Sequence, residues 1–119
     1  MVINSYQDLN VWKQAIELCD IIYDLTDKYP KKEIYGLTNQ MRRCAISVPS
    51  NIAEGFGRRS TGDYLRFLKI ALGSLSELET QIIISVRRKY LNSNFNMNQI
   101  IILKKMINKM ISGIYKSTA

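Results

Sequence analysis

Residues 42–60 read RRCAISVPSNIAEGFGRRS, a helical pattern with a proline inside it and an arginine pair at each end. Pro49 has no backbone N–H, and its ring clashes with the carbonyl four residues earlier, at a cost of about 3 kcal/mol in an ordinary helix. A short helical protein keeps such a residue where the surrounding packing compensates, so we predict a helix that is kinked at Pro49 and tightly packed. The small residues that would permit this packing are Ala45, Ser47, Ser50 and Ala53.

Four segments repeat apolar residues every three or four positions, which is the spacing of amphipathic helices. The first segment follows Asp8, a predicted N-cap, and ends at Pro30. The second begins near Glu33, and the third begins after Ser60, another residue type that favours the N-cap position. A polar connection over residues 92–96 leads to the fourth segment.

The apolar stripes also predict the class of fold. Since no segment alternates apolar and polar residues over a useful length, we expect no sheet. Short connections favour antiparallel neighbours, so we predict one all-α domain over residues 1–119, an antiparallel up-and-down four-helix bundle with the second helix kinked at Pro49. The first helix carries two neighbouring stripes, which are Leu9, Trp12, Ile16, Cys19, Tyr23 and Thr26, and Val11, Ala15, Leu18, Ile22, Leu25 and Tyr29.

The composition argues against several classes of protein. The 119 residues include no histidine, which removes the commonest general base and metal ligand, and Cys19 and Cys44 are too few for a zinc site. Both cysteines are interpreted as small, reduced core residues rather than as a disulfide. Residues 1–10 do not have the pattern of a secretory signal, and the longest aliphatic run covers only residues 100–103, so we expect a soluble cytoplasmic protein without a membrane span.

Few side chains offer catalytic chemistry. Glu54, Glu77 and Glu79 are the carboxylates with apolar or small neighbours, and each is better interpreted as a helix-end partner of a cation or as a surface group than as an acid catalyst. The glycines of residues 55–61 precede a helix start, as in a phosphate-binding loop, but no strand precedes them and the ending of a P-loop is missing. We therefore expect no enzyme, cofactor or metal, and keep only a phosphate contact open for this segment.

The positive charge is unevenly distributed along the chain. Residues 1–33 carry four basic and six acidic side chains, whereas residues 34–119 carry 13 basic and four acidic ones. Arginine forks suit bidentate phosphate contacts, and we expect those of the two middle helices to gather on one electropositive face that binds RNA. A merely solvated face is the alternative, and the shortage of neighbouring aromatic residues favours backbone recognition over base stacking. The predicted phosphate contacts are Arg42, Arg43, Arg58, Arg59, Arg66, Lys69, Arg87 and Arg88.

Five motifs resemble a known family of small bacterial four-helix bundles, the 23S rRNA intervening-sequence proteins. They are YQDLNVWK (6–13), YGLTNQMRR (35–43), SVPSNIAEG (47–55), YLRFL (64–68) and GSLSELET (73–80). The resemblance covers about residues 6 to 116. It implies a helical bundle that assembles into a homopentameric ring and implies no catalytic activity; a related group serves as accessory factor to the reverse transcriptase of retroelements.

Two functional hypotheses follow. The first is a non-enzymatic, oligomeric bundle that binds structured, rRNA-associated RNA through its arginines. The second is a protein-interaction scaffold that recruits a reverse transcriptase or another nucleic-acid enzyme, with the acidic first helix as its docking face. An enzyme of unknown type is the weakest alternative.

Overall fold

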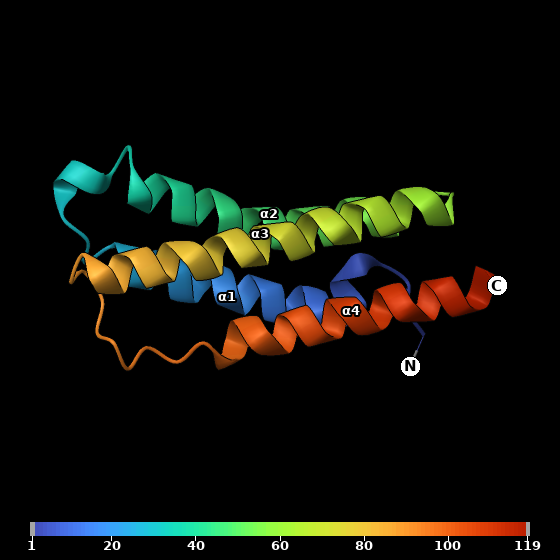
Figure 1. The fold of residues 1–119 in the computed structure, drawn as a ribbon. Coiled ribbons are helices and arrows are strands. Elements are labelled where there is room, and N and C mark those ends of the chain that lie inside the picture. The colour runs from blue at the N-terminus through green and yellow to red at the C-terminus, as the bar shows by residue number, and fades with distance from the viewer. Residues whose placement is uncertain (1, 119) are drawn as a thin grey trace.

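The structure is a computed structural model that describes residues 2–118. Four long helices account for most of this range, and two short 3₁₀ helices precede α1 and α2 (Figure 1). The described residues contain no strand, so the predicted all-α class is confirmed. The elements in chain order are η1 (Tyr6–Asp8), α1 (Asn10–Thr26), η2 (Lys31–Glu33), α2 (Leu37–Phe56), α3 (Thr61–Arg87) and α4 (Asn98–Thr118).

Consecutive helices run in opposite directions (Figure 1). Between α2 and α3, the Ser47 and Ser74 hydroxyls lie 2.7 Å apart, and Ser85 Oγ donates to Met41 Sδ at 3.5 Å. As the residue number decreases from Ser47 to Met41 in α2, the number of the contacting residue in α3 increases from Ser74 to Ser85. The two helices are therefore antiparallel. The other neighbouring pairs give the same order through Cys19 to Ala45 and Arg42 to Thr26 for α1 and α2, and through Lys104 to Glu79 and Lys69 to Tyr115 for α3 and α4.

The core lies along the predicted stripes of all four helices. The stripe that begins at Val11 is buried except for Leu25, which is partly buried, whereas Ile16 and Tyr23 of the other stripe remain 37% and 40% exposed. The apolar face of α1 is therefore wider than the bundle covers. The core residues exposed by less than 2% are led by Leu18, Ile22, Met41, Val48, Ile52, Leu68, Leu75, Leu78, Ile82, Ile100, Leu103 and Ile107.

Pro49 lies within α2 and is buried, as close packing requires. The carbonyl that a normal residue at 49 would satisfy is that of Ala45, and it accepts a hydrogen bond from the Cys19 thiol instead, at 3.2 Å. Burial, with a smaller contribution from Asp20, raises the pKa of Cys19 to about 11, so the thiol keeps the proton that it donates. Both cysteines are free, as predicted, and the bend at Pro49 stays a prediction.

Two predicted helix starts are wrong. Asp8 belongs to η1, where its carboxylate accepts from the backbone N–H groups of Asn4 and Ser5, and α1 follows Leu9 without a side-chain cap. Residues 33–36 form a 3₁₀ turn and a loop, so α2 begins at Leu37 rather than near Glu33. In both places, a short-range hydrogen-bonded turn precedes the helix proper.

The third predicted start is correct. The Ser60 hydroxyl accepts from the Asp63 N–H at 3.1 Å and caps α3. α3 then continues for 27 residues, about 40 Å at 1.5 Å per residue. It spans most of the 47 Å length of the molecule, so Arg58 and Arg59 before it lie far from Arg87 and Arg88 at its end.

Candidate nucleic-acid interface

The predicted phosphate contacts are divided between the two ends of the bundle. Arg58 and Arg59 precede α3, whereas Arg87 and Arg88 are at its other end. Because α3 is about 40 Å long, the two arginine pairs lie far apart and do not form one compact cluster, and the single electropositive face stays a prediction. In Figure 1 the connection between α2 and α3 lies at the end of the bundle near the chain termini, and the last turn of α3 lies at the opposite end.

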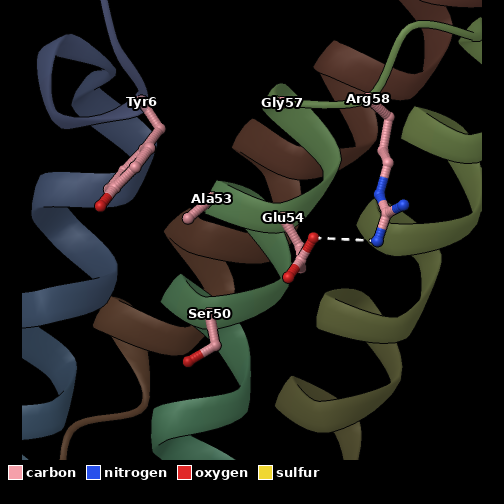
Figure 2. A pocket seen from close by; sticks show the side chains of 6 residues that line it. All are labelled: Tyr6, Ser50, Ala53, Glu54, Gly57 and Arg58. Atoms are coloured by element: carbon pink, nitrogen blue, oxygen red, sulfur yellow. Dashed lines mark hydrogen bonds and ion pairs between the residues drawn. The ribbon is translucent and has the colours of Figure 1, made fainter.

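The group near the chain termini is called the corner here and consists of Arg58, Arg59, Arg66 and Lys69. Its charges are partly neutralised. Arg58 pairs with Glu54 at 3.0 Å, as Figure 2 shows, and Arg66 approaches Asp63 at 3.8 Å. Both guanidinium groups also lie over the ring of Phe67, at 4.9 and 4.5 Å from its centroid. The carboxylate of Glu54 thus has the helix-end role that its sequence position predicts.

Lys69 at the corner also has a partner within the protein. Its ammonium group donates to the Tyr115 hydroxyl at 2.8 Å and so connects α3 with α4. Arg59 differs, since it is exposed and forms no ion pair within the described residues. Three of the four corner cations therefore have contacts that a phosphate would have to replace or share.

Glycine at position 55 determines how tightly the corner packs. A Cβ atom on Gly55 would lie 2.9 Å from Tyr64 Cδ1 and 3.0 Å from Phe67 Cβ, so α2 and α3 approach closely here. Gly55 lies inside α2, and Gly57 ends that helix with ordinary right-handed geometry at φ −80°. The glycines therefore form no loop of free amides, and the alternative of a glycine-rich phosphate site is not supported.

A groove of about 630 Å³ opens beside the corner (Figure 2). In Figure 2 the Tyr6 side chain lies across this groove from α2, and the Arg58 side chain turns toward Glu54. Because one carboxylate accompanies the one arginine, an anion gains little net attraction in this groove. The lining residues are Tyr6, Ser50, Ala53, Glu54, Gly57 and Arg58.

The second group is called the loop end here and consists of Lys31, Lys32, Arg87, Arg88 and Lys89. Two contacts assemble it from separate segments. The rings of Tyr29 and Tyr90 lie 5.4 Å apart, and the Tyr90 hydroxyl donates to Glu33 Oε2 at 2.8 Å. They hold the connection between α1 and α2 against the end of α3. All five cations are exposed, and none forms an ion pair within the part of the chain that the structure describes.

The Glu33 carboxylate lies in the field of two of these cations, Lys32 and Arg88. The hydrogen bond from Tyr90 lowers the pKa of Glu33 most, the Leu37 N–H and the charges of Lys32 and Arg88 lower it further, and burial opposes them. The ionised Glu33 carboxylate therefore offsets part of the positive charge of Lys32 and Arg88. The sequence does not predict a role for Lys31 and Lys32, although one signal exists, since α1 and α3 must end at the same end of an up-and-down bundle.

Arg42 and Arg43 are neighbours with different surroundings. Arg42 donates to Thr26 Oγ1 at 2.9 Å and to Asp27 at 2.8 Å, and its guanidinium lies 4.6 Å from the Tyr23 ring centroid. It joins α2 to α1 and is removed from the set of free phosphate contacts. Arg43 is exposed and lines a polar groove of about 480 Å³ between α2 and α3, together with Asn39, Gln40, Cys44, Ser47, Ser74 and Glu77.

The described residues offer no group of three or more carboxylate, cysteine or histidine side chains that could hold a metal ion. Cys44 Sγ lies 3.4 Å from Glu77 Oε2, to which it donates, and accepts from Gln81 Nε2 at the same distance. Burial raises the pKa of the Cys44 thiol, which favours the protonated form. Over the same part of the chain, no helix combines the length and the hydropathy that crossing a membrane requires.

These features define a small, basic, all-α four-helix bundle with a group of exposed cations at each end. The chain belongs to the 23S rRNA-intervening sequence protein family, whose family model matches residues 7–113. The fold is similar to the crystal structure of a protein with unknown function from the S23 ribosomal protein family of Bacteroides thetaiotaomicron VPI-5482. That match has 19% sequence identity and a TM-score of 0.62, and covers 89% of this chain and 95% of the other. Among curated proteins there is no match.

Proposed function

We propose that this protein is a non-enzymatic, oligomeric bundle that binds structured RNA, with the loop end as its main phosphate contact. The observation that carries the proposal is the cluster of five exposed cations without ion pairs at the loop end. Free cations on an exposed end gain more from a phosphate than cations that already have a carboxylate partner, because no existing pair must be broken.

The family supports RNA as the polyanion. Its name refers to intervening sequences of 23S rRNA, and the chain matches its model over residues 7–113. Arg87 and Arg88 bring planar forks that suit phosphate oxygens, and Arg43 extends the positive surface into the groove between α2 and α3. We expect recognition of shape and backbone to provide most of the affinity.

Exposed apolar side chains on the outer helix faces support the oligomeric part of the proposal. Ile83 and Ile84 of α3 are 52% and 43% exposed, and Ile101 and Ile102 of α4 are 40% and 45% exposed. Repeated copies of one loop end would convert weak contacts into a high overall affinity. The resemblance noted above makes a pentamer the expected state, which analytical ultracentrifugation can test.

A second function, that of a scaffold for a partner protein, is favoured by one observation. An apolar groove of about 470 Å³ runs between α1 and α2, beside the acidic Asp20. Its apolar lining, which an exposed protein docking site requires, is provided mainly by Trp12, Ile16, Cys19, Tyr23, Ile46 and Pro49. Purification separates the two functions, since co-purifying nucleic acid supports RNA binding and a stoichiometric protein partner supports the scaffold.

The salt dependence of binding tests the RNA proposal. A fluorescent RNA hairpin is titrated with the protein at several salt concentrations. The five loop-end cations and Arg43 make six phosphate contacts, which predict that log affinity falls with log salt with a slope of about −4.2 to −5.4. A matched control removes two exposed lysines that belong to neither group, in Lys13→Ala/Lys105→Ala, and should keep this slope. Absence of binding at low salt, or a slope near zero, would contradict the proposal.

A further inference from the structure

The Tyr35 side chain is unusually exposed for an aromatic residue. It is 93% exposed, the largest value among the large apolar and aromatic side chains of the described residues, and its neighbour Ile34 is 54% exposed. Other tyrosines have partners, as Tyr29 and Tyr90 do in each other. Tyr35 has no ring, cation or hydrogen-bond contact of its side chain within the described residues. The fold therefore does not explain this ring.

The turn that carries Tyr35 is fixed by hydrogen bonds. The Ile34 N–H donates to the Lys31 carbonyl at 3.1 Å, and the Gly36 N–H donates to the Glu33 carbonyl at 2.9 Å. The Glu33 carboxylate accepts from the Leu37 N–H at 3.1 Å and connects the turn to the start of α2. The backbone under Tyr35 is thus ordered before any partner arrives, which lowers the entropic cost of binding.

Glycine at position 36 leaves room for the Glu33 carboxylate. A Cβ atom there would lie 2.8 Å from Glu33 Oε1, so a larger residue would displace the carboxylate. That carboxylate also accepts from the Tyr90 hydroxyl, which joins the turn to the end of α3. Tyr35 lies two residues along the chain from Glu33. The charges of Lys32 and Arg88 both lower the pKa of the Glu33 carboxylate.

From this placement we infer that the loop end binds an unpaired nucleotide of the RNA, whose base stacks on Tyr35 while neighbouring phosphates contact the loop-end cations. The inference rests on the proposed function and adds the class of RNA that this site takes. Bases within a duplex already stack on one another, whereas bases in loops and bulges are free to stack on an aromatic ring. The charge of the loop end disfavours a second copy of the same surface, because contact would oppose two sets of five cations.

This interpretation revises the sequence-based expectation that base stacking is not indicated. That expectation is based on the shortage of aromatic residues close to the arginines in the sequence. Tyr35 is more than 50 residues from Arg87 and Arg88 in the sequence, and the bundle brings the two segments to the same end (Figure 1).

Two RNA probes and three variants test the inference. One probe is a hairpin with an unpaired loop, and the other is a blunt duplex with the same number of phosphates. Tyr35→Ala should weaken hairpin binding about tenfold and leave duplex binding and the salt slope unchanged. Tyr35→Phe should bind as the wild type does, since it keeps the ring. Ile34→Ala is the matched control, because it removes exposed apolar surface from the same turn without removing a ring.

Each outcome separates the inference from the proposed function. If Tyr35→Ala binds both probes as the wild type does, the nucleotide site is wrong while salt-dependent RNA binding stands. A loss of oligomeric mass in Tyr35→Ala would assign the ring to self-association and also overturn the site. If no RNA binds the wild type with a salt dependence, the proposed function itself fails. Thermal unfolding of the variants should match the wild type, since Tyr35 is outside the core.

Discussion

The two ends of the α2–α3 hairpin carry similar numbers of cations in different surroundings. At the corner, Arg58 and Arg66 have carboxylates three or four residues away on the chain, and both lie on the Phe67 ring. At the loop end, the five cations have no ion-pair partner among the described residues. The comparison shows that the number of basic residues alone does not locate a phosphate-binding surface.

The difference has a structural origin. The corner is a short connection between two consecutive helices, so its ion pairs are local. The loop end joins segments far apart in the sequence, and a hydrogen bond between Tyr90 and Glu33 holds them together. The corner therefore stabilises the hairpin, and the loop end is the surface that we propose binds RNA.

The largest effect on the corner is expected from Gly55→Ala. The new methyl group would overlap Tyr64 and Phe67, and the strain should exceed the gain in helix propensity. We expect a loss of about 1–2 kcal/mol in the free energy of unfolding, measured by urea titration. RNA affinity of the folded fraction should not change.

Gly57→Ala is the matched control for this variant. Its Cβ atom would lie at least 3.8 Å from other atoms, and φ is −80°, so stability should stay within about 0.5 kcal/mol of the wild type. Equal destabilisation by the two substitutions would mean that close packing at Gly55 does not hold the corner.

A smaller effect is expected for Arg42→Ala. The variant loses the hydrogen bond to buried Thr26 and the exposed pair with Asp27, which together should stabilise the fold by about 1 kcal/mol. Its RNA affinity should remain that of the wild type.

Arg43→Ala should show the opposite result, with unchanged thermal unfolding and a salt slope that is smaller by about 0.7–0.9. Reduced RNA affinity in Arg42→Ala alone would contradict the division between structural and free arginines.

The smallest effect concerns the pH dependence of the loop end. Because Glu33 has a lowered pKa in the folded state, its contribution to stability is present above the unfolded pKa and is lost as pH falls through the folded pKa. Tyr90→Phe removes the largest cause of that lowering, so its stability should fall less steeply below about pH 4.3. Urea midpoints at neutral and acidic pH measure this. Tyr29→Phe should keep the wild-type pH dependence of stability. If Tyr90→Phe also keeps it, the hydrogen bond from Tyr90 to Glu33 does not contribute to that dependence.

Much of the fold follows from the sequence, because helix periodicity and capping are local. The third periodic segment is a helix in which Leu68, Leu75 and Ile82 are buried, and Ser60 caps it as predicted. Glu77 and Glu79 face opposite neighbours, Cys44 and Lys104, as expected for residues on either side of a core position. Local turns explain the errors at Asp8 and Glu33, since a 3₁₀ turn and a helix start share the same capping residues.

The site is harder to predict, because it depends on contacts between distant segments. Lys31 and Lys32 belong to an acidic N-terminal third of the sequence, but in space Lys32 and Arg88 lie close to the same carboxylate, that of Glu33. Conversely, Arg42 has the residue type of a phosphate ligand and is bound to α1 instead. Helix direction is the one sequence-based clue that places the ends of α1 and α3 together.

Paired charge deletions test the central claim most directly. Arg87→Ala/Arg88→Ala and Arg58→Ala/Arg59→Ala each remove two arginines, so they differ only in the end of the hairpin that loses charge. Salt titrations of hairpin RNA binding should show a slope that is smaller by about 1.4–1.8 in the loop-end variant, and less than half of that change in the corner variant. An equal change in both variants, or a larger one at the corner, would contradict the assignment of the loop end as the binding surface.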